Sequence, residues 1–254
     1  MNIILPLSFL FLGLFVGSFL NVVILRWGTN KSIIKGRSVC AHTGKPLFWY
    51  DLIPVLSFII LKGKSRFSGE ALSVQYPLVE IITGILFLGV YQIVGSVSAL
   101  LFLYLISVSL LIVICFYDLR TKIIPNSLVY SFIVISLLIL LLKGFEVGDF
   151  WAAPLLWFPF AFLWLVSKGA WIGYGDAKLA WGMGLFLGLW GGISAVLIAF
   201  WVGAVISLVL LFLQRFQLSF LPKSLTIKSE VPFAPFLVIG TLLVLFFNLN
   251  VFVF

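Results

Sequence analysis

Charged residues are scarce in this sequence. Of its 254 residues, 9% are Asp, Glu, Lys or Arg, whereas 63% are hydrophobic. A soluble domain is typically about a quarter charged, so this chain lacks the polar residues needed to cover a surface in water. A disordered chain is excluded for the same reason, because disorder requires low hydrophobicity. The composition indicates a polytopic membrane protein.

Histidine and cysteine are also rare, which limits the chemistry. The single histidine, His42, lies in a basic loop far in sequence from a good nucleophile, and we interpret it as a solvated loop residue. A Ser-His-Asp or Cys-His device is therefore not supported, and neither a P-loop nor an H-E-x-x-H motif is present. Cys40 and Cys115 allow one disulfide at most, and we expect two unpaired thiols because Cys115 lies inside an apolar run.

Long apolar runs fill most of the chain. A bilayer core needs about 20 apolar residues per helix. We therefore expect an all-α protein with about eight transmembrane helices, near residues 3–25, 72–94, 97–117, 126–142, 150–167, 177–190, 192–213 and 234–254. The first run is too long for a signal peptide and lacks a basic start and a cleavage site, so we expect it to remain in the mature protein.

The basic residues are distributed very unevenly between the two sides of these spans. With eight spans, fifteen of the sixteen Lys and Arg residues fall on one side and Lys143 alone on the other. The positive-inside rule makes the basic side cytoplasmic and puts both termini outside. The net charge of +8 also favours contact with anionic membrane lipid, and we expect no nucleic-acid partner.

The long basic loop at 26–71 contains a second apolar feature. Residues 47–61 are apolar but too short to span, and Pro54 interrupts them. We interpret the segment as lying on the cytoplasmic leaflet, with Trp49 and Tyr50 at headgroup level. A re-entrant turn is the alternative.

Three carboxylates lie within or at the edge of the predicted spans: Glu80, Asp118 and Asp176. Such groups cost about 2.5–3.5 kcal/mol on insertion scales, so each is a candidate functional residue. The other acidic residues fall in loops, where a solvated charge is the simpler interpretation; they are Asp51, Glu70, Glu146, Asp149 and Glu230.

Asp118 and Asp176 face the same side of the membrane in this topology. A structural interpretation remains open, in which Asp118 pairs with Arg120 or Lys122 and Asp176 caps a helix beside Lys178. If the two carboxylates meet, however, one keeps a proton and the other ionises, which is the arrangement of an aspartic protease.

Two glycines precede the second aspartate, in the order Gly173-Tyr174-Gly175-Asp176. They would let a substrate backbone approach closely, and Gly175 would also permit a turn into the helix. The Gly-x-Gly pair lacks the third glycine and the preceding strand of a dinucleotide site, so we do not interpret it as one.

These residues resemble the type IV prepilin peptidases, membrane aspartic proteases with a Gly-x-Gly-Asp signature. The similarity covers nearly the whole chain. Five segments in order carry it: GSFLNVVILR (17–26), WYDLIPVLSFIILKGK (49–64), QYPLVEIITG (75–84), YDLRTKIIPN (117–126) and GYGDAK (173–178).

The resemblance implies a reaction and a site. Family members cut prepilins and pseudopilins after a glycine that ends a short basic leader, on the cytoplasmic side, and many then methylate the new N-terminus with S-adenosylmethionine. By resemblance, Asp118 and Asp176 are the catalytic pair. Further residues are implied in support of substrate binding, namely Gly173, Gly175, Lys178 and Asn126, and in methyl transfer, namely Gly63, Lys64 and Glu80.

The same resemblance implies two parts of the chain. Residues 1–95 form the half associated with methyl transfer, and residues 96–254 form the aspartic peptidase membrane domain. Because no soluble methyltransferase fold fits in this chain, the methylation interpretation rests on analogy alone.

One departure from the family concerns zinc. Many bacterial members carry two Cys-x-x-Cys pairs in the first loop, the signature of a tetrahedral zinc site. Here the matching positions are 40–43, which read Cys-Ala-His-Thr, and 65–68, which read Ser-Arg-Phe-Ser. Since hydroxyl groups are poor zinc ligands, we expect no metal, and the loop must be held in another way.

Two other classes of function remain as alternatives. Glu80, Asp118 and Asp176 could act as an ion or proton relay in a transporter or channel. Two of them lie at one membrane face, though, and no inverted repeat is visible. A non-catalytic scaffold for pilus assembly is the other alternative, which the presence of both aspartates disfavours.

Overall fold

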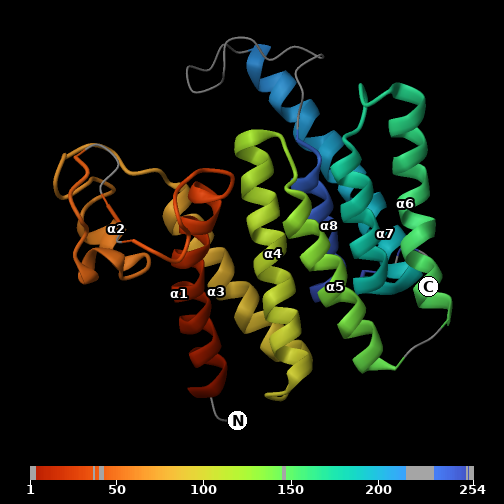
Figure 1. The fold of residues 1–254 in the computed structure, drawn as a ribbon, viewed down its shortest axis with the longest axis horizontal. Coiled ribbons are helices and arrows are strands. Elements are labelled where there is room, and N and C mark those ends of the chain that lie inside the picture. The colour runs from red at the N-terminus through yellow and green to blue at the C-terminus, as the bar shows by residue number, and fades with distance from the viewer. Residues whose placement is uncertain are drawn as a thin grey trace. The chain divides into compact units, whose positions relative to one another are not determined.

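The computed structural model describes residues 4–36, 38–39, 43–144, 147–215, 232–249 and 251. In these residues the regular structure is helical, apart from two isolated antiparallel bridges, Val39 with Pro46 and Lys64 with Ala71. Six of the described helices are long and apolar enough to cross a membrane, and a shorter apolar helix lies near the C-terminus. The expected all-α polytopic class is therefore confirmed (Figure 1).

The chain divides into two compact units, Met1–Val113 and Ile114–Phe254. The first unit contains α1 (Ile4–Arg26), η1 (Trp49–Leu52), α2 (Leu56–Ile60) and α3 (Gln75–Val94). Helix α4 (Ala99–Thr121) begins in the first unit and ends in the second. The second unit continues with α5 (Asn126–Lys143), α6 (Val147–Ser167), α7 (Tyr174–Arg215) and α8 (Ala234–Phe247).

Helices α1 and α3 pack closely because small residues line their contact. A Cβ on Gly13 would lie 2.7 Å from the Cα of Gly84, and one on Gly17 would lie 2.7 Å from the Cα of Glu80. This is the small-xxx-small spacing that lets membrane helices approach backbone to backbone. The Asn21 side chain in α1 also donates to the Tyr76 carbonyl in α3, at 3.0 Å.

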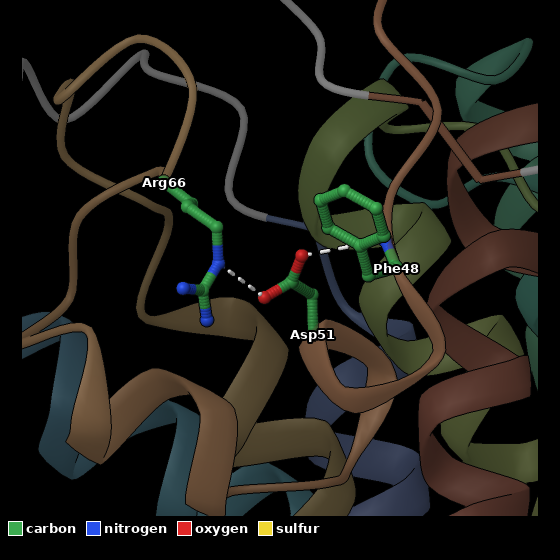
Figure 2. A network of polar contacts seen from close by, with 3 residues as sticks. All are labelled: Phe48, Asp51 and Arg66. Atoms are coloured by element: carbon green, nitrogen blue, oxygen red, sulfur yellow. Dashed lines mark hydrogen bonds and ion pairs between the residues drawn. The ribbon is translucent and has the colours of Figure 1, made fainter.

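Asp51 organises the loop between α1 and α3. Its carboxylate accepts a hydrogen bond from the Phe48 backbone N–H at 3.3 Å and from Nε of Arg66 at 2.9 Å (Figure 2). The Asp51 side chain is only 4% exposed, so interpreting it as a solvated loop charge was wrong. The aromatic rings of Phe48, Tyr50 and Phe67 pack around this pair. The ion pair and the rings hold the turns that contain residues 48–51 and 65–68.

Helix α7 contains a break in the region of two predicted spans. The two expected spans, 177–190 and 192–213, belong to one assigned helix that breaks at Gly188, where φ is 75° and ψ is −177°. A Cβ on Gly192 would lie 3.6 Å from the Cα of Gly184, whereas eight residues of straight helix would separate them by about 12 Å. The chain therefore folds back at Gly188. The two predicted spans correspond to the segments on either side of this break.

Helix α8 is shorter than the span predicted at 234–254. It ends at Phe247, where Asn248 adopts a left-handed conformation with φ 51° and donates its N–H to the Val244 carbonyl. Fourteen residues of helix are about 21 Å long, less than the hydrocarbon core of a bilayer. Asn248 therefore ends α8, although the apolar composition continues beyond it.

Helices α5, α6, α7 and α8 form the body of the second unit, with α7 packed against the other three. Figure 1 shows α5, α6 and α7 as neighbouring helices. Close packing again depends on glycine: a Cβ on Gly184 would lie 2.7 Å from the backbone of Ala152 in α6, and a Cβ on Gly240 would collide with the Ala195 carbonyl. These contacts pack the two segments of α7, one on each side of Gly188, closely against α6 and α8.

Candidate active site

Asp118 lies in the last turn of α4 and is 4% exposed. Its backbone carbonyl accepts the N–H of Lys122 at 2.8 Å, and Lys122 then leaves the helix with φ 55°. The carboxylate accepts a hydrogen bond from the backbone N–H of Ala234, the first residue of α8. The start of a helix carries partial positive charge, so this contact favours an ionised carboxylate.

Asp176 lies in the first turn of α7 and is 6% exposed. Its backbone N–H donates to the Gly173 carbonyl at 3.1 Å, which fixes the turn into the helix. Its side-chain oxygen Oδ1 is buried and has no hydrogen-bond partner among the described residues. A buried polar atom without a partner costs free energy, so this oxygen is available to a proton, a water or a substrate group.

The two aspartates come close enough for their carboxyl groups to interact electrostatically. Helix α5 begins five residues after Thr121, the last residue of α4, and packs against α7, which brings the segments 117–126 and 173–178 together. Two buried like charges in this position repel, so the pair favours a state in which one carboxyl holds a proton and the other does not.

Lys178 does not neutralise this pair. Its ammonium group donates to Oδ1 of Asn126 at 2.7 Å and lies 4.8 Å from the ring centroid of Tyr174 and 5.4 Å from that of Tyr130. Among the described residues, neither aspartate forms an ion pair with a lysine or an arginine. Within these residues, the alternative in which Asp118 pairs with Arg120 or Lys122 is therefore wrong.

Gly173 and Gly175 are explained differently from the prediction. Neither has a positive φ, and Gly175 lies inside the first turn of α7, so the expectation that it permits a turn was wrong. Instead, a Cβ on Gly175 would lie 2.9 Å from the Cβ of Ile124, the residue two before Asn126. Gly175 thus allows the two aspartate segments to approach each other. Gly173 is exposed beside the Asp176 carboxylate.

Glu80 lies in the other unit, at 7% exposure in α3. Its Oε2 accepts the backbone N–H of Val55 at 2.8 Å, and its carboxylate also forms a hydrogen bond with the Ser18 hydroxyl. Val55 has φ 61°, a conformation that a β-branched residue rarely adopts. Glu80 therefore ties the loop to α3.

Gly63 and Lys64 follow α2, in a turn that this loop contains. The Gly63 N–H donates to the Phe58 carbonyl at 2.9 Å, and the backbone there has φ 69°. Lys64 is exposed. Gly63 and Lys64 are neighbours in the sequence. Glu80 contacts the same loop at Val55, eight residues before Gly63.

Sequence reasoning missed two features of the loop and its anchoring. Asn21 is buried at 2% exposure inside α1 and bridges to α3; an asparagine within a predicted span was a usable signal. The pair formed by Asp51 and Arg66 carried no such signal, because fifteen residues separate them.

Metal ligands were expected to be absent from this chain. No group of three or more His, Cys, Asp or Glu residues that could hold a metal occurs in the part of the chain that the structure describes. Cys40 and His42, the candidate zinc ligands of the first loop, lie outside the described residues. Cys115 is a free thiol.

Two known family profiles match the chain. Residues 11–94 match the profile of the bacterial peptidase A24 N-terminal domain, and residues 105–208 match that of the type IV leader peptidase family. The second match contains Asp118, Asn126, Gly173, Asp176 and Lys178. The comparison with solved structures found no significant match.

Several relatives are similar over most of the chain. A prepilin leader peptidase/N-methyltransferase of Myxococcus xanthus is 37% identical over 214 residues, which is 80% of this chain and 62% of the relative. One of Klebsiella pneumoniae is 37% identical over 195 residues, or 71% of this chain and 85% of the relative. One of Bacillus subtilis is 31% identical over 243 residues, or 93% and 92%.

The fold and the site thus define a polytopic membrane protein with two buried aspartates. One lies at the end of α4 and the other at the start of α7. The chain belongs to the prepilin leader peptidase/N-methyltransferase family.

Proposed function

We propose that this protein is a membrane aspartic endopeptidase that removes the basic leader of prepilins or pseudopilins after a glycine and then methylates the new N-terminus. The observation that carries the peptidase assignment is the buried, electrostatically interacting pair Asp118 and Asp176, with Oδ1 of Asp176 lacking a partner among the described residues. Family membership supports the same reaction.

Peptide hydrolysis at neutral pH needs an activated water and a polarised carbonyl. In the proposed mechanism, the ionised member of the pair removes a proton from water while the protonated member donates a hydrogen bond to the scissile carbonyl oxygen. The hydroxide attacks the carbonyl carbon, and the proton taken from water passes to the departing amine. No histidine or cysteine is needed, which agrees with the rarity of both residues.

The surrounding residues support the pair in this proposal. Lys178 and Asn126 hold the beginnings of α7 and α5 together, and Gly175 lets these segments meet. Gly173, exposed next to Asp176, offers a substrate backbone close access.

A transporter function is less well supported. A proton or ion relay requires carboxylates distributed along a path through the membrane. Asp118, in the last turn of α4, and Asp176, in the first turn of α7, instead lie near enough to one another to interact electrostatically.

The proposed location is the bacterial cytoplasmic (inner) membrane, with the aspartates at its cytoplasmic face and both termini outside. The uneven distribution of Lys and Arg supports this orientation. The prepilin's apolar segment would then lie in the bilayer with its basic leader in the cytoplasm.

Methyl transfer is proposed for the first part of the chain, residues 1–95, and peptide cleavage for residues 96–254. S-adenosylmethionine would supply the methyl group. The Glu80 carboxylate accepts hydrogen bonds from the Val55 N–H and the Ser18 hydroxyl, which connect α3 to the loop and to α1. We therefore propose that Glu80 supports methyl transfer through the loop that also carries Gly63 and Lys64.

The experiment that tests this function measures the mass of a pilin N-terminus after incubation of a prepilin with the purified protein in detergent, with and without S-adenosylmethionine. Cleavage after the leader glycine and a further mass gain of one methyl group are expected. In Glu80→Ala, which removes the acceptor for the Val55 N–H, we expect leader release with an unmethylated amine. An intact prepilin with folded wild-type protein would contradict the peptidase assignment, and equal loss of both activities in Glu80→Ala would make Glu80 structural.

A further inference from the structure

The loop between α1 and α3 exposes an unusual set of apolar side chains. They lie on η1 and α2 and comprise Trp49, Leu52, Leu56, Ile59 and Ile60, which we call the loop patch. Ile59 is 63% exposed and Ile60 is 71% exposed, about as much as Ile85 (57%) on the membrane-spanning helix α3. Contiguous apolar side chains at this exposure indicate a surface that water does not cover.

Helix α2 is too short to bury these side chains itself. It has five residues. The Phe58 ring packs against Gly63, and its Cζ would lie 3.2 Å from a Cβ added there. Ile59 and Ile60 therefore point away from the loop's own core, which is built around Asp51, Arg66 and the rings of Phe48 and Phe67.

A hydrogen bond fixes the depth of this patch. The N–H of Val55, the residue before α2, donates to Glu80 at 2.8 Å. Glu80 lies five residues after Gln75, the first residue of α3, which is about 7.5 Å along the helix axis. Helix α2 therefore starts level with the second turn of α3, near one end of a helix that is long and apolar enough to span a bilayer.

The charges next to the patch match an anionic surface. Lys62 and Lys64 directly follow α2 and both are exposed. Asp51, in contrast, is buried and paired with Arg66. An apolar face with adjacent lysines is typical of segments that lie in the interface of an anionic membrane.

We propose that the loop patch is a membrane-surface anchor: η1 and α2 lie in the headgroup region of an anionic leaflet, and Glu80 sets their depth through Val55. This arrangement puts the exposed Trp49 in the headgroup region, where tryptophan is enriched in membrane proteins. The anchor concerns how this loop is held and does not depend on the peptidase or methyltransferase activity.

The test measures depth in the full-length protein, reconstituted in vesicles of phosphatidylethanolamine and phosphatidylglycerol. Cysteine replaces Ile59, Ile60, Ile85 or Lys31 one at a time in a Cys40→Ser, Cys115→Ala background, and each site is spin-labelled. Accessibility to oxygen, which concentrates in lipid, is compared with that to a water-soluble nickel chelate. Labels at 59 and 60 should favour oxygen, as at 85, and the label at 31 should favour nickel.

Two other outcomes overturn the proposal. Nickel accessibility at 59 and 60 equal to that at 31 means that the patch faces water. Shielding from both reagents means that protein covers it, either a second copy or a substrate. Replacing the anionic vesicles with phosphatidylcholine should raise nickel accessibility at 59, and no change would overturn the anionic part of the proposal.

A matched pair of variants tests the role of Glu80. Glu80→Ala removes the acceptor for the Val55 N–H, so the label at 59 should gain nickel accessibility while the label at 85 stays unchanged. Glu80→Gln keeps a carbonyl oxygen at the same place and should preserve the wild-type depth. Equal depth in the alanine and glutamine variants would show that the Val55 contact does not hold the anchor.

Discussion

At the scale of single residues, closeness in sequence is a poor guide to partners in this protein. Lys178 is two residues from Asp176, yet its ammonium group contacts Asn126 and the rings of Tyr130 and Tyr174. The aspartates are left without a cationic partner among the described residues. Two buried carboxyl groups without a cationic partner lower the stability of the fold, but they can act as an acid and a base.

The first prediction concerns the pair itself. Asp118→Asn, Asp176→Asn and the double variant should all show the same background rate of prepilin cleavage, because the two groups act as one unit and their losses do not add. An Asp→Glu substitution at either position should lower the cleavage rate about 100-fold, since one extra methylene displaces the carboxylate by about 1 Å. Steady-state cleavage rates measure this, with size-exclusion profiles as the control for folding. Substantial cleavage by either asparagine variant would exclude the mechanism.

A second prediction separates support from substrate binding at Lys178. If its bond to Asn126 positions the aspartates, then Lys178→Met, Asn126→Ala and the double variant should lower kcat by similar amounts. A hydrogen bond to a charged group contributes about 1.5–3 kcal/mol, so the double-mutant cycle should show coupling of that order. Lys178→Arg, which keeps a donor, should recover part of the rate. Additive effects that fall on KM alone would instead place Lys178 against the substrate.

At the scale of elements, glycine decides where helices break and where they touch. Gly188 combines φ 75° with ψ −177°, a region open in practice only to glycine, and it turns α7 back so that Gly184 and Gly192 meet. Gly182 and Gly184 instead lie within regular helix and lack side chains because Phe132 and the Ala152 backbone fill that space.

The third prediction tests the break in α7. Gly188→Ala should destabilise the protein by about 1–3 kcal/mol, because alanine is strained at this backbone conformation, and its Cβ would also lie 2.7 Å from Oδ1 of Asp149. The measurement is thermal unfolding in detergent. Gly148→Ala, one residue from Asp149 in α6, is the matched control: nothing lies within 4 Å of its added Cβ, so its stability should be unchanged or slightly higher. Equal stability of the two variants would contradict the fold-back at Gly188.

Most helices could be predicted from apolar run length, because a bilayer requires it. The predicted spans at 3–25, 72–94, 97–117 and 126–142 agree with α1, α3, α4 and α5 to within a few residues at each end. Run length could not show that α8 ends at Phe247, since apolar residues continue beyond it. Nor could it show that Gly175 packs against Ile124, because that contact depends on the docking of α7 on the α4–α5 connection.

At the scale of the whole molecule, α4 connects the two compact units. The boundary between the units falls at Val113 and Ile114, inside this helix, whereas the two family matches are separated earlier, between residues 94 and 105. One continuous helix thus begins in the unit that holds Glu80 and ends in the unit that holds the aspartates. The positions of Asp118 and Asp176 in sequence predict that they lie at the same membrane side, whereas their closeness to one another depends on packing within the second unit.

The last prediction concerns the orientation of the chain in the membrane, and with it the side on which the aspartates act. Fifteen of sixteen basic residues fall on one side of the predicted spans, and lysine and arginine are retained in the cytoplasm during insertion. In the cysteine-free background, Lys143→Cys should react with an impermeant maleimide in spheroplasts, and Lys35→Cys should react only after lysis. Lys143 ends α5 and Asn126 begins it, so labelling of Lys143→Cys from outside puts Asn126, and the neighbouring Asp176 segment, at the cytoplasmic face where a basic leader would be presented. The reverse labelling pattern would put the pair outside and would contradict both the orientation and the proposed site of cleavage.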